Sequence, residues 1–183
     1  MQDFHFFSEY YPGARYLQKS AIPNMLCKKI QKQNLLIELG CGIGENLNLY
    51  KSAGFGGQIV AYDLCLRYEK PKTQGITLIE GDVRQTLMPQ DRPIDILYVD
   101  LDADPEATRF ALRQLSQQIN NSWIYIDEFL RGDAIVFAQW LLEVYYDFSI
   151  YGYTEHGALI KLGQGQTADH LILSLEQYSQ VPQ

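Results

Sequence analysis

Short apolar runs alternate along the chain with amphipathic stretches and turn residues. The residues between the runs place their apolar side chains at helical rather than strand spacing. This alternation of strand and helix predicts parallel βαβ units, in which both faces of a sheet are buried. Five runs have the length and composition of buried strands, at residues 35–39, 58–63, 76–82, 94–100 and 123–128.

The helical segments have recognisable boundaries. Ser20 is a candidate N-cap for a helix over residues 22–30, and Pro23 suits the first turn of that helix. The stretch 45–53 predicts a short helix that ends before Gly54. Further helices are expected from Asp104 onward and at 132–146, the latter strongly apolar.

The end of the chain breaks the parallel pattern. Residues 148–153 and 157–162 flank a tight turn and predict an antiparallel hairpin. Residues 1–19 are aromatic-rich and predict no regular element, while the LILSLEQY stretch of the tail fits either a helix or a strand. The whole chain is expected to form one α/β domain, with an N-terminal segment 1–34 as a lid or helix, a core 35–162 and a tail 163–183.

Composition removes several classes of protein. A length of 183 residues fits about one domain. Asp plus Glu is 22 and Lys plus Arg is 15, and the resulting net charge of −7 argues against a nucleic-acid partner. The sequence shows no membrane-spanning apolar run and no signal peptide, so a cytoplasmic location without a membrane partner is expected. Three cysteines without a CxxC pair predict neither a disulfide framework nor structural zinc.

A glycine-rich loop follows the first predicted strand as E-L-G-C-G-I-G, residues 38–44. Glycines let the backbone approach a ligand closely, and the next helix offers free N–H groups. The third glycine comes one residue earlier than in the dinucleotide fingerprint G-x-G-x-x-G. Glu45 at the helix start would repel a pyrophosphate. The loop therefore favours a nucleotide-like ligand that has no phosphate at this point.

Carboxylates stand at the carboxyl ends of the following strands. Asp63 ends the second strand, where it can accept both hydroxyls of a ribose. Asp82 ends the third, where it can accept from the exocyclic amine of a base. Each aspartate has an alternative interpretation as a simple helix cap. Their joint occurrence with the glycine loop favours the binding interpretation.

The loop E-L-G-C-G-I-G resembles the first motif of class I S-adenosylmethionine-dependent methyltransferases, and the similarity covers about residues 34–162. The resemblance implies S-adenosylmethionine as cofactor and a Rossmann-like, doubly wound, seven-stranded sheet, mostly parallel with an antiparallel terminal hairpin. By position it implies that the loop passes under the methionine part and that Asp63 binds the ribose hydroxyls. It also implies that the 82–83 pair holds the adenine and that Asp100 lies near the methionine amino group. The implied cofactor residues are Glu38, Gly40, Gly42, Gly44, Asp63, Leu64, Asp82, Val83 and Asp100.

A second cluster of acids is similar to that of macrocin-type O-methyltransferases, many of which use Mg²⁺. Asp102, Asp127 and Glu128 are the candidate metal ligands. A Mg²⁺ ion held by them would bind two substrate oxygens and lower the pKa of the one to be methylated. Without a metal, Asp102 or Asp127 would act as a general base. The remaining alternative is that Asp104 caps the helix at Pro105 and the other acids are solvated.

Other side chains are weaker candidates. His156 lies in the hairpin turn and is a candidate catalytic base, with a surface histidine as the alternative. Cys41 is interpreted as a packing residue. Tyr10, Tyr11 and Tyr16 form a hypothetical lid over the cofactor site.

The expected function is S-adenosylmethionine-dependent O-methylation of a small-molecule acceptor. No aromatic-Pro-Pro-aromatic run follows the fourth strand, which disfavours amide or adenine methylation. A nicotinamide-dependent oxidoreductase is a rival enzyme class, disfavoured by the early third glycine and Glu45. A second rival is a silent, methyltransferase-like binding module or partner subunit. About 34 residues precede the first strand, so a partner or a second copy in a homo-oligomer would then complete the site.

Overall fold

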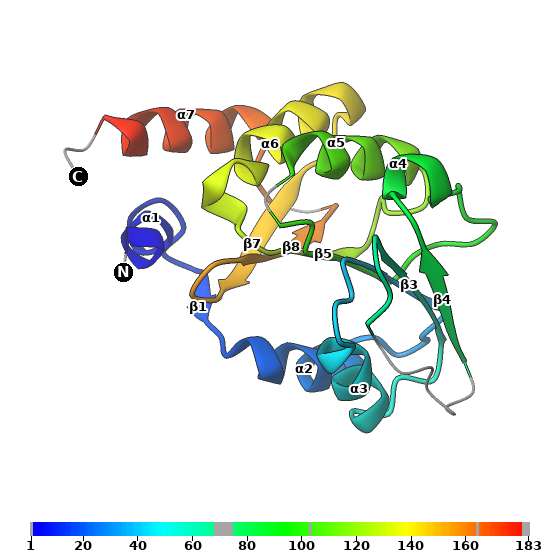
Figure 1. Ribbon diagram of the computed structural model, residues 1–183. Coiled ribbons are helices and arrows are strands. Elements are labelled where there is room, and N and C mark those ends of the chain that lie inside the picture. Colours follow the sequence, from blue (N-terminus) through cyan, green and yellow to red (C-terminus); the bar gives the residue numbers. More distant parts are fainter. Residues whose placement is uncertain (1, 68–74, 103, 164, 181–183) are drawn as a thin grey trace.

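A computed structural model describes residues 2–67, 75–102, 104–163 and 165–180 (Figure 1). Residues 164 and 181–183 of the expected tail lie outside this described part. One sheet organises the fold, with strand order β1-β7-β8-β6-β5-β2-β3-β4. The strands are β1 (Arg15–Tyr16), β2 (Leu35–Leu39), β3 (Gln58–Asp63), β4 (Ile76–Glu80), β5 (Ile96–Val99), β6 (Trp123–Ile126), β7 (Phe148–Tyr153) and β8 (Ala158–Leu162).

The predicted α/β class is confirmed, with one correction to the strand count. β2 pairs in parallel with β3 and β5, while β8 lies antiparallel between β6 and β7. Over the described residues the sheet has eight strands rather than seven, because β1 pairs in parallel with β7 at its edge. The backbone N–H of Leu17 extends this pairing by donating to Tyr153 O at 2.7 Å. A two-residue strand is too short to show a period in the sequence.

Helices cover both faces of the sheet. In Figure 1, α2 and α3 lie on one face, and α5, α6 and α7 lie on the other. The all-buried pattern of β2 follows from this double cover. None of the helices in the described residues is long and apolar enough to span a membrane. The helices are α1 (Gln2–Tyr10), α2 (Ile22–Lys29), α3 (Glu45–Ser52), α4 (Val83–Thr86), α5 (Pro105–Gln114), α6 (Asp133–Val144) and α7 (Ala168–Ser179), with 3-10 turns at Lys19–Ala21 and Phe129–Arg131.

The N-terminal segment differs from its prediction. Residues 1–19 were expected to be irregular, but α1 forms because Phe6 and Phe7 are buried against the rest of the protein. The Phe7 ring stacks on Tyr153 of β7, with 4.6 Å between ring centroids. Ser20 does not cap a helix through its side chain; it lies in the 3-10 turn, and Ala21 is the N-cap of α2. The LILSLEQY stretch is helical, within α7.

The candidate site lies at the carboxyl ends of the parallel strands. β5 and β2 are neighbours, and the chain continues outward from them in opposite directions, to β6 on one side and to β3 and β4 on the other. Such a switch point opens a crevice between the loops that leave the two strands. The glycine loop leaves β2 there, and Asp63, Asp100 and Asp127 end or follow β3, β5 and β6.

Candidate functional site

The glycine loop takes a backbone conformation that side chains resist. Gly40, Gly42 and Gly44 have φ angles of 80°, 52° and 78°, all in the left-handed region. A Cβ on Gly40 would collide with the carbonyl oxygen of Asp100. The loop therefore packs directly on the end of β5. Gly44 serves as the N-cap of α3.

Asp63 ties the glycine loop to β3. One carboxylate oxygen accepts the N–H of Gly42 at 2.7 Å, and the other accepts the N–H of Cys65 at 3.0 Å. Each carboxylate oxygen has a further lone pair available. The side chain also borders a cavity of about 220 Å³. Asp63 is thus placed to hold the loop and to accept hydrogen bonds from a ligand.

Asp82 has a structural role as well as a position at the smaller cavity. Its carboxylate accepts the N–H of Arg84 at 2.9 Å and so caps α4. The guanidinium of Arg84 also donates to both carboxylate oxygens, from Nε to Oδ1 at 2.9 Å and from Nη2 to Oδ2 at 2.8 Å. These contacts with Arg84 hold the pKa of Asp82 below its ordinary value. Buried Val83 and exposed Leu64 line the same cavity.

A larger cavity of about 700 Å³ adjoins the smaller one. Its walls come from segment 16–20, the glycine loop, the start of α3, the ends of β5 and β6, and the turn 154–156. Gly40, Gly42 and Asp100 line both cavities. An elongated ligand that crosses the glycine loop can therefore occupy the smaller cavity and enter the larger one.

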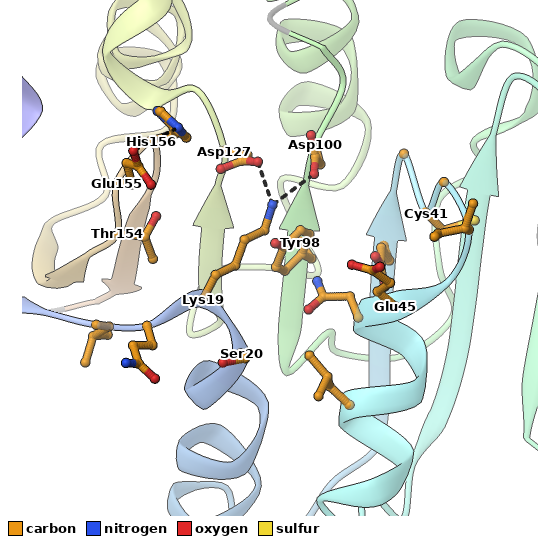
Figure 2. Close-up of a pocket in the computed structure, with 18 of the residues that line it drawn as sticks. Lys19, Ser20, Cys41, Glu45, Tyr98, Asp100, Asp127, Thr154, Glu155 and His156 are labelled. Carbon is orange, nitrogen blue, oxygen red and sulfur yellow. Dashed lines mark hydrogen bonds and ion pairs between the residues drawn. The ribbon is translucent and has the colours of Figure 1, made fainter.

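A lysine from the N-terminal segment reaches into the larger cavity. Figure 2 shows Lys19 between two strand-end carboxylates. Its Nζ lies 2.7 Å from Asp127 Oδ2 and 3.3 Å from Asp100 Oδ2. The ammonium also lies 5.7 and 5.9 Å from the ring centroids of Tyr98 and Tyr125, which stack on each other. The lysine is thus held by opposite charges and by the faces of two rings.

The second oxygen of Asp127 is also bound. Tyr125 Oη donates to Asp127 Oδ1 at 2.9 Å and lies 2.8 Å from Thr154 Oγ1. Burial by itself would lower the pKa of Lys19, but the hydrogen bond to Asp127 and the charge of Asp100 raise it above its ordinary value. Lys19 is therefore a cation at neutral pH.

Two other carboxyl groups of the cavity have raised pKa values. Burial, followed by repulsion from Asp127, raises the pKa of Asp100 to about 6, although Lys19 opposes the shift. Burial raises the pKa of Glu38 to about 8, against an opposing contact with Asn46. Glu38 Oε2 is buried with no hydrogen-bond partner among the described residues. Glu38 therefore holds a proton at neutral pH, as the low polarity around it requires.

We compared the sequence and the structure with those of known proteins. No family model and no curated protein matches the sequence. A Clostridium thermocellum structure whose name describes an rRNA methylase has a TM-score of 0.60 at 16% identity, over 80% of this chain and 96% of that chain. Precorrin-6y C5,15-methyltransferase from Geobacter metallireducens GS-15 has 0.54 at 15% identity, over 79% and 87%. A SAM-dependent methyltransferase from Aquifex aeolicus has 0.53 at 12% identity, over 80% and 94%.

The chain has the class I S-adenosylmethionine-dependent methyltransferase fold. This confirms the fold expected from E-L-G-C-G-I-G. The similarity to macrocin-type O-methyltransferases finds no support in these comparisons, which show the fold alone at such low identity.

The residues present fit the cofactor that this methyltransferase fold implies. Gly40 and Gly42 present bare backbone to both cavities, and Asp63 can accept further hydrogen bonds beside them. Asp100 lines both cavities, so a ligand that spans them would pass its side chain. Eight of the nine predicted cofactor residues line one or both cavities, and the ninth, Gly44, is the N-cap of α3.

The acids predicted to bind Mg²⁺ do not fit a metal site. Asp102 is exposed, has a left-handed φ of 51° and lines the smaller cavity, whereas Asp127 lines the larger one. Glu128 pairs with Arg131 at 2.7 Å. Within the described residues, no group of three or more His, Cys, Asp or Glu side chains is arranged to hold a metal. The described residues thus give no support to the predicted shared Mg²⁺ site, and the partner of Asp127 in this structure is Lys19.

The remaining residues singled out in the sequence differ in how deeply they are buried. His156 lines the larger cavity, with its side chain 45% exposed and 3.8 Å from Glu155. Of the proposed tyrosine lid, Tyr16 lines this cavity, while Tyr11 is buried in the core and Tyr10 packs against it. Burial raises the pKa of Cys41 to about 12, with Glu38 adding to the shift, so this cysteine is a protonated wall residue.

Sequence reasoning missed Lys19, Tyr98 and Thr154. Tyr98 and Thr154 belong to predicted strands or turns and carry no local signal of their own. Lys19 lies in a segment with no recognised motif, and the two residues it contacts follow strands far along the chain. The sequence shows Lys19 only as a lone lysine just before a predicted helix. Such lysines are common on protein surfaces, so this position did not mark Lys19 as a site residue.

Proposed function

We propose that this protein is an S-adenosylmethionine-dependent methyltransferase that methylates a hydroxyl oxygen of a small molecule. The observation that carries the proposal is the pair of adjoining cavities with Gly40, Gly42 and Asp100 in common. The smaller one has the residues expected for a nucleoside. The larger one extends past them, over the ends of β5 and β6, and leaves room for a second substrate.

The cofactor half is assigned to loops after β2, β3 and β4. Asp63 would accept the ribose hydroxyls, Asp82 and Val83 would border the adenine, and Asp100 would receive the methionine ammonium. When bound, the cofactor supplies a methyl group already activated on a sulfonium. Alignment of the acceptor and exclusion of water are then the main tasks of the protein.

The acceptor half is assigned to the wall formed by β5, β6 and the turn 154–156. Asp127 borders this space and would take the proton of the acceptor hydroxyl. His156 borders the same space and is the second candidate for this role. Asp102, which lines the smaller cavity, is less well placed for it.

A small-molecule acceptor is favoured by size and charge. The larger cavity, at about 700 Å³, has the volume typical of small-molecule sites. Its lining includes acids from the glycine loop, the strand ends and the hairpin turn, and the chain has a net charge of −7. Both features disfavour binding to the phosphate backbone of a nucleic acid.

Calorimetric titration with S-adenosylhomocysteine, with NAD as the control ligand, tests the cofactor assignment. We expect micromolar binding of the thioether and none of NAD. Asp63→Asn should weaken thioether binding by at least about tenfold, because one charge-assisted hydrogen bond is lost. Asp91→Asn, at an 85% exposed side chain outside both cavities, should leave it unchanged.

Binding of NAD, or absence of thioether binding, would contradict the cofactor assignment. Thioether binding without turnover on any of a broad panel of hydroxyl acceptors would favour the silent binding module over the enzyme.

A further inference from the structure

Lys19 is the strongest feature that the proposed reaction leaves unused. Among the described residues that line the larger cavity, it is the single lysine or arginine. Its side chain is 44% exposed, so it faces the cavity and is not sealed in the core. A lone basic residue among several acids of the same cavity calls for an explanation beyond surface charge.

The sheet order places Lys19 on the acceptor side. The cofactor residues belong to the loops after β2, β3 and β4, and Asp100 marks the junction at β5. Lys19 reaches past that junction to Asp127 after β6, on the far side of β5 from β2. In Figure 2 its ammonium lies between Asp100 and Asp127, on the side of His156 and away from Cys41 of the glycine loop.

The ammonium is held in place but retains binding capacity. A lysine has three N–H donors, and two are directed to Asp127 and Asp100. The faces of Tyr98 and Tyr125 support it from below the strand ends. A fixed cation with a spare donor is the arrangement that stabilises negative charge as it develops on an oxygen.

We propose that Lys19 is the built-in cation of the acceptor site: it binds the acceptor oxygen, takes the place that a divalent metal would fill, and selects phenol-like hydroxyl groups. This inference rests on the proposed function. The acceptor O–H proton passes to Asp127, a lone pair of that oxygen forms the new C–O bond, and the electron pair of the breaking C–S bond stays on sulfur.

The choice of a phenol-like hydroxyl follows from the partners of Asp127. An aspartate is a weak base, and here both its oxygens already accept hydrogen bonds, from Lys19 and Tyr125. It can take a proton only from a hydroxyl that ionises readily. Leu17, Leu49 and the ring of Tyr16 also line the cavity and suit an aromatic acceptor.

The test uses 4-nitrophenol, whose ionised form absorbs visible light, titrated with pH against protein saturated with S-adenosylhomocysteine. On the wild type, we expect the bound probe to ionise at a pH about one unit lower than in solution, equally with Mg²⁺ or with EDTA. Lys19→Arg should keep this shift, because it keeps the charge. Lys19→Met should lose it and bind the phenolate at least about tenfold more weakly.

Lys29→Met is the matched control. Lys29 also lies over aromatic rings, 4.7 Å from the centroid of Tyr151, but outside the larger cavity, and its replacement should leave the probe unaffected. Three results would overturn the inference: an unchanged shift in Lys19→Met, a shift that requires Mg²⁺, or no probe binding by protein that binds the thioether. Failure of the wild type to bind S-adenosylhomocysteine would instead contradict the proposed function itself. Thermal unfolding of each variant verifies that it is folded.

Discussion

Asp100 lines both cavities, and its surroundings set the charge that it carries near neutral pH. Burial and the neighbouring Asp127 raise its pKa to about 6, while Lys19 limits the rise. The group therefore changes charge just below neutral pH. Its ionised form suits the ammonium of a bound amino acid, and its protonated form does not.

Cofactor affinity should accordingly depend on pH through Asp100. As the pH falls through about 6, the carboxylate gains a proton, and S-adenosylhomocysteine should bind more weakly, by up to about tenfold at pH 5. Methylthioadenosine has no amino-acid part and should show little change over the same range. Calorimetry of both ligands between pH 5 and 8 measures the difference. Parallel pH curves for the two ligands would contradict the placement of Asp100 at the ammonium.

At the scale of elements, α1 and β1 carry Lys19 to the site. Phe7 of α1 stacks on Tyr153, and Tyr153 of β7 pairs with Tyr16 of β1. Three residues after Tyr16, Lys19 enters the larger cavity. The packing of α1 against β7 thereby helps to position Lys19 beside the carboxyl ends of β5 and β6.

Replacing Phe7 with Ala should destabilise the protein by about 3–4 kcal/mol, because a buried ring is lost and a cavity remains. Phe4→Ala is the control on the same helix, since Phe4 is 56% exposed, and it should cost less than about 1 kcal/mol. Urea unfolding of the two variants provides the comparison. Equal losses would show that α1 is not anchored through Phe7.

On the scale of the whole molecule, the buried carboxyl of Glu38 links folding to pH. Its pKa is about 8 in the folded protein, well above its ordinary value, because burial penalises the charged form. The folded state therefore binds a proton that the unfolded state releases above about pH 4.3. The stabilising contribution is complete below that pH and is lost as the pH rises through about 8.

The free energy of unfolding should thus decline between pH 5 and 8, by at most about 1.4 kcal/mol per pH unit from this group. Glu38→Gln removes the titration and should give a flatter profile than the wild type. Glu106→Gln, on the exposed start of α5, should keep the wild-type slope. Denaturant unfolding at several pH values measures all three. An identical slope in Glu38→Gln would rule out Glu38 as the titrating group.

The sequence by itself determined those features that depend on neighbouring residues. Strand and helix periods predicted β2, β3, β5 and β6, and E-L-G-C-G-I-G predicted a loop whose glycines take positive φ angles. Asp104 caps α5 as its position before Pro105 suggested, through the N–H groups of Glu106 and Ala107. The period of a strand, the cap of a helix and the turn of a glycine loop are all local in the chain.

Only the tertiary structure decided what meets across the sheet. Lys19 contacts residues 81 and 108 positions away, and a contact over such a separation leaves no mark on the sequence around it. α1 is likewise helical because Phe6 and Phe7 find a buried surface, not because the segment has a clear helical pattern. The predicted metal site gains no support from the described residues for a related reason. Acids that follow neighbouring strands share an edge, but their side chains reach different cavities and partners, and packing alone sets those.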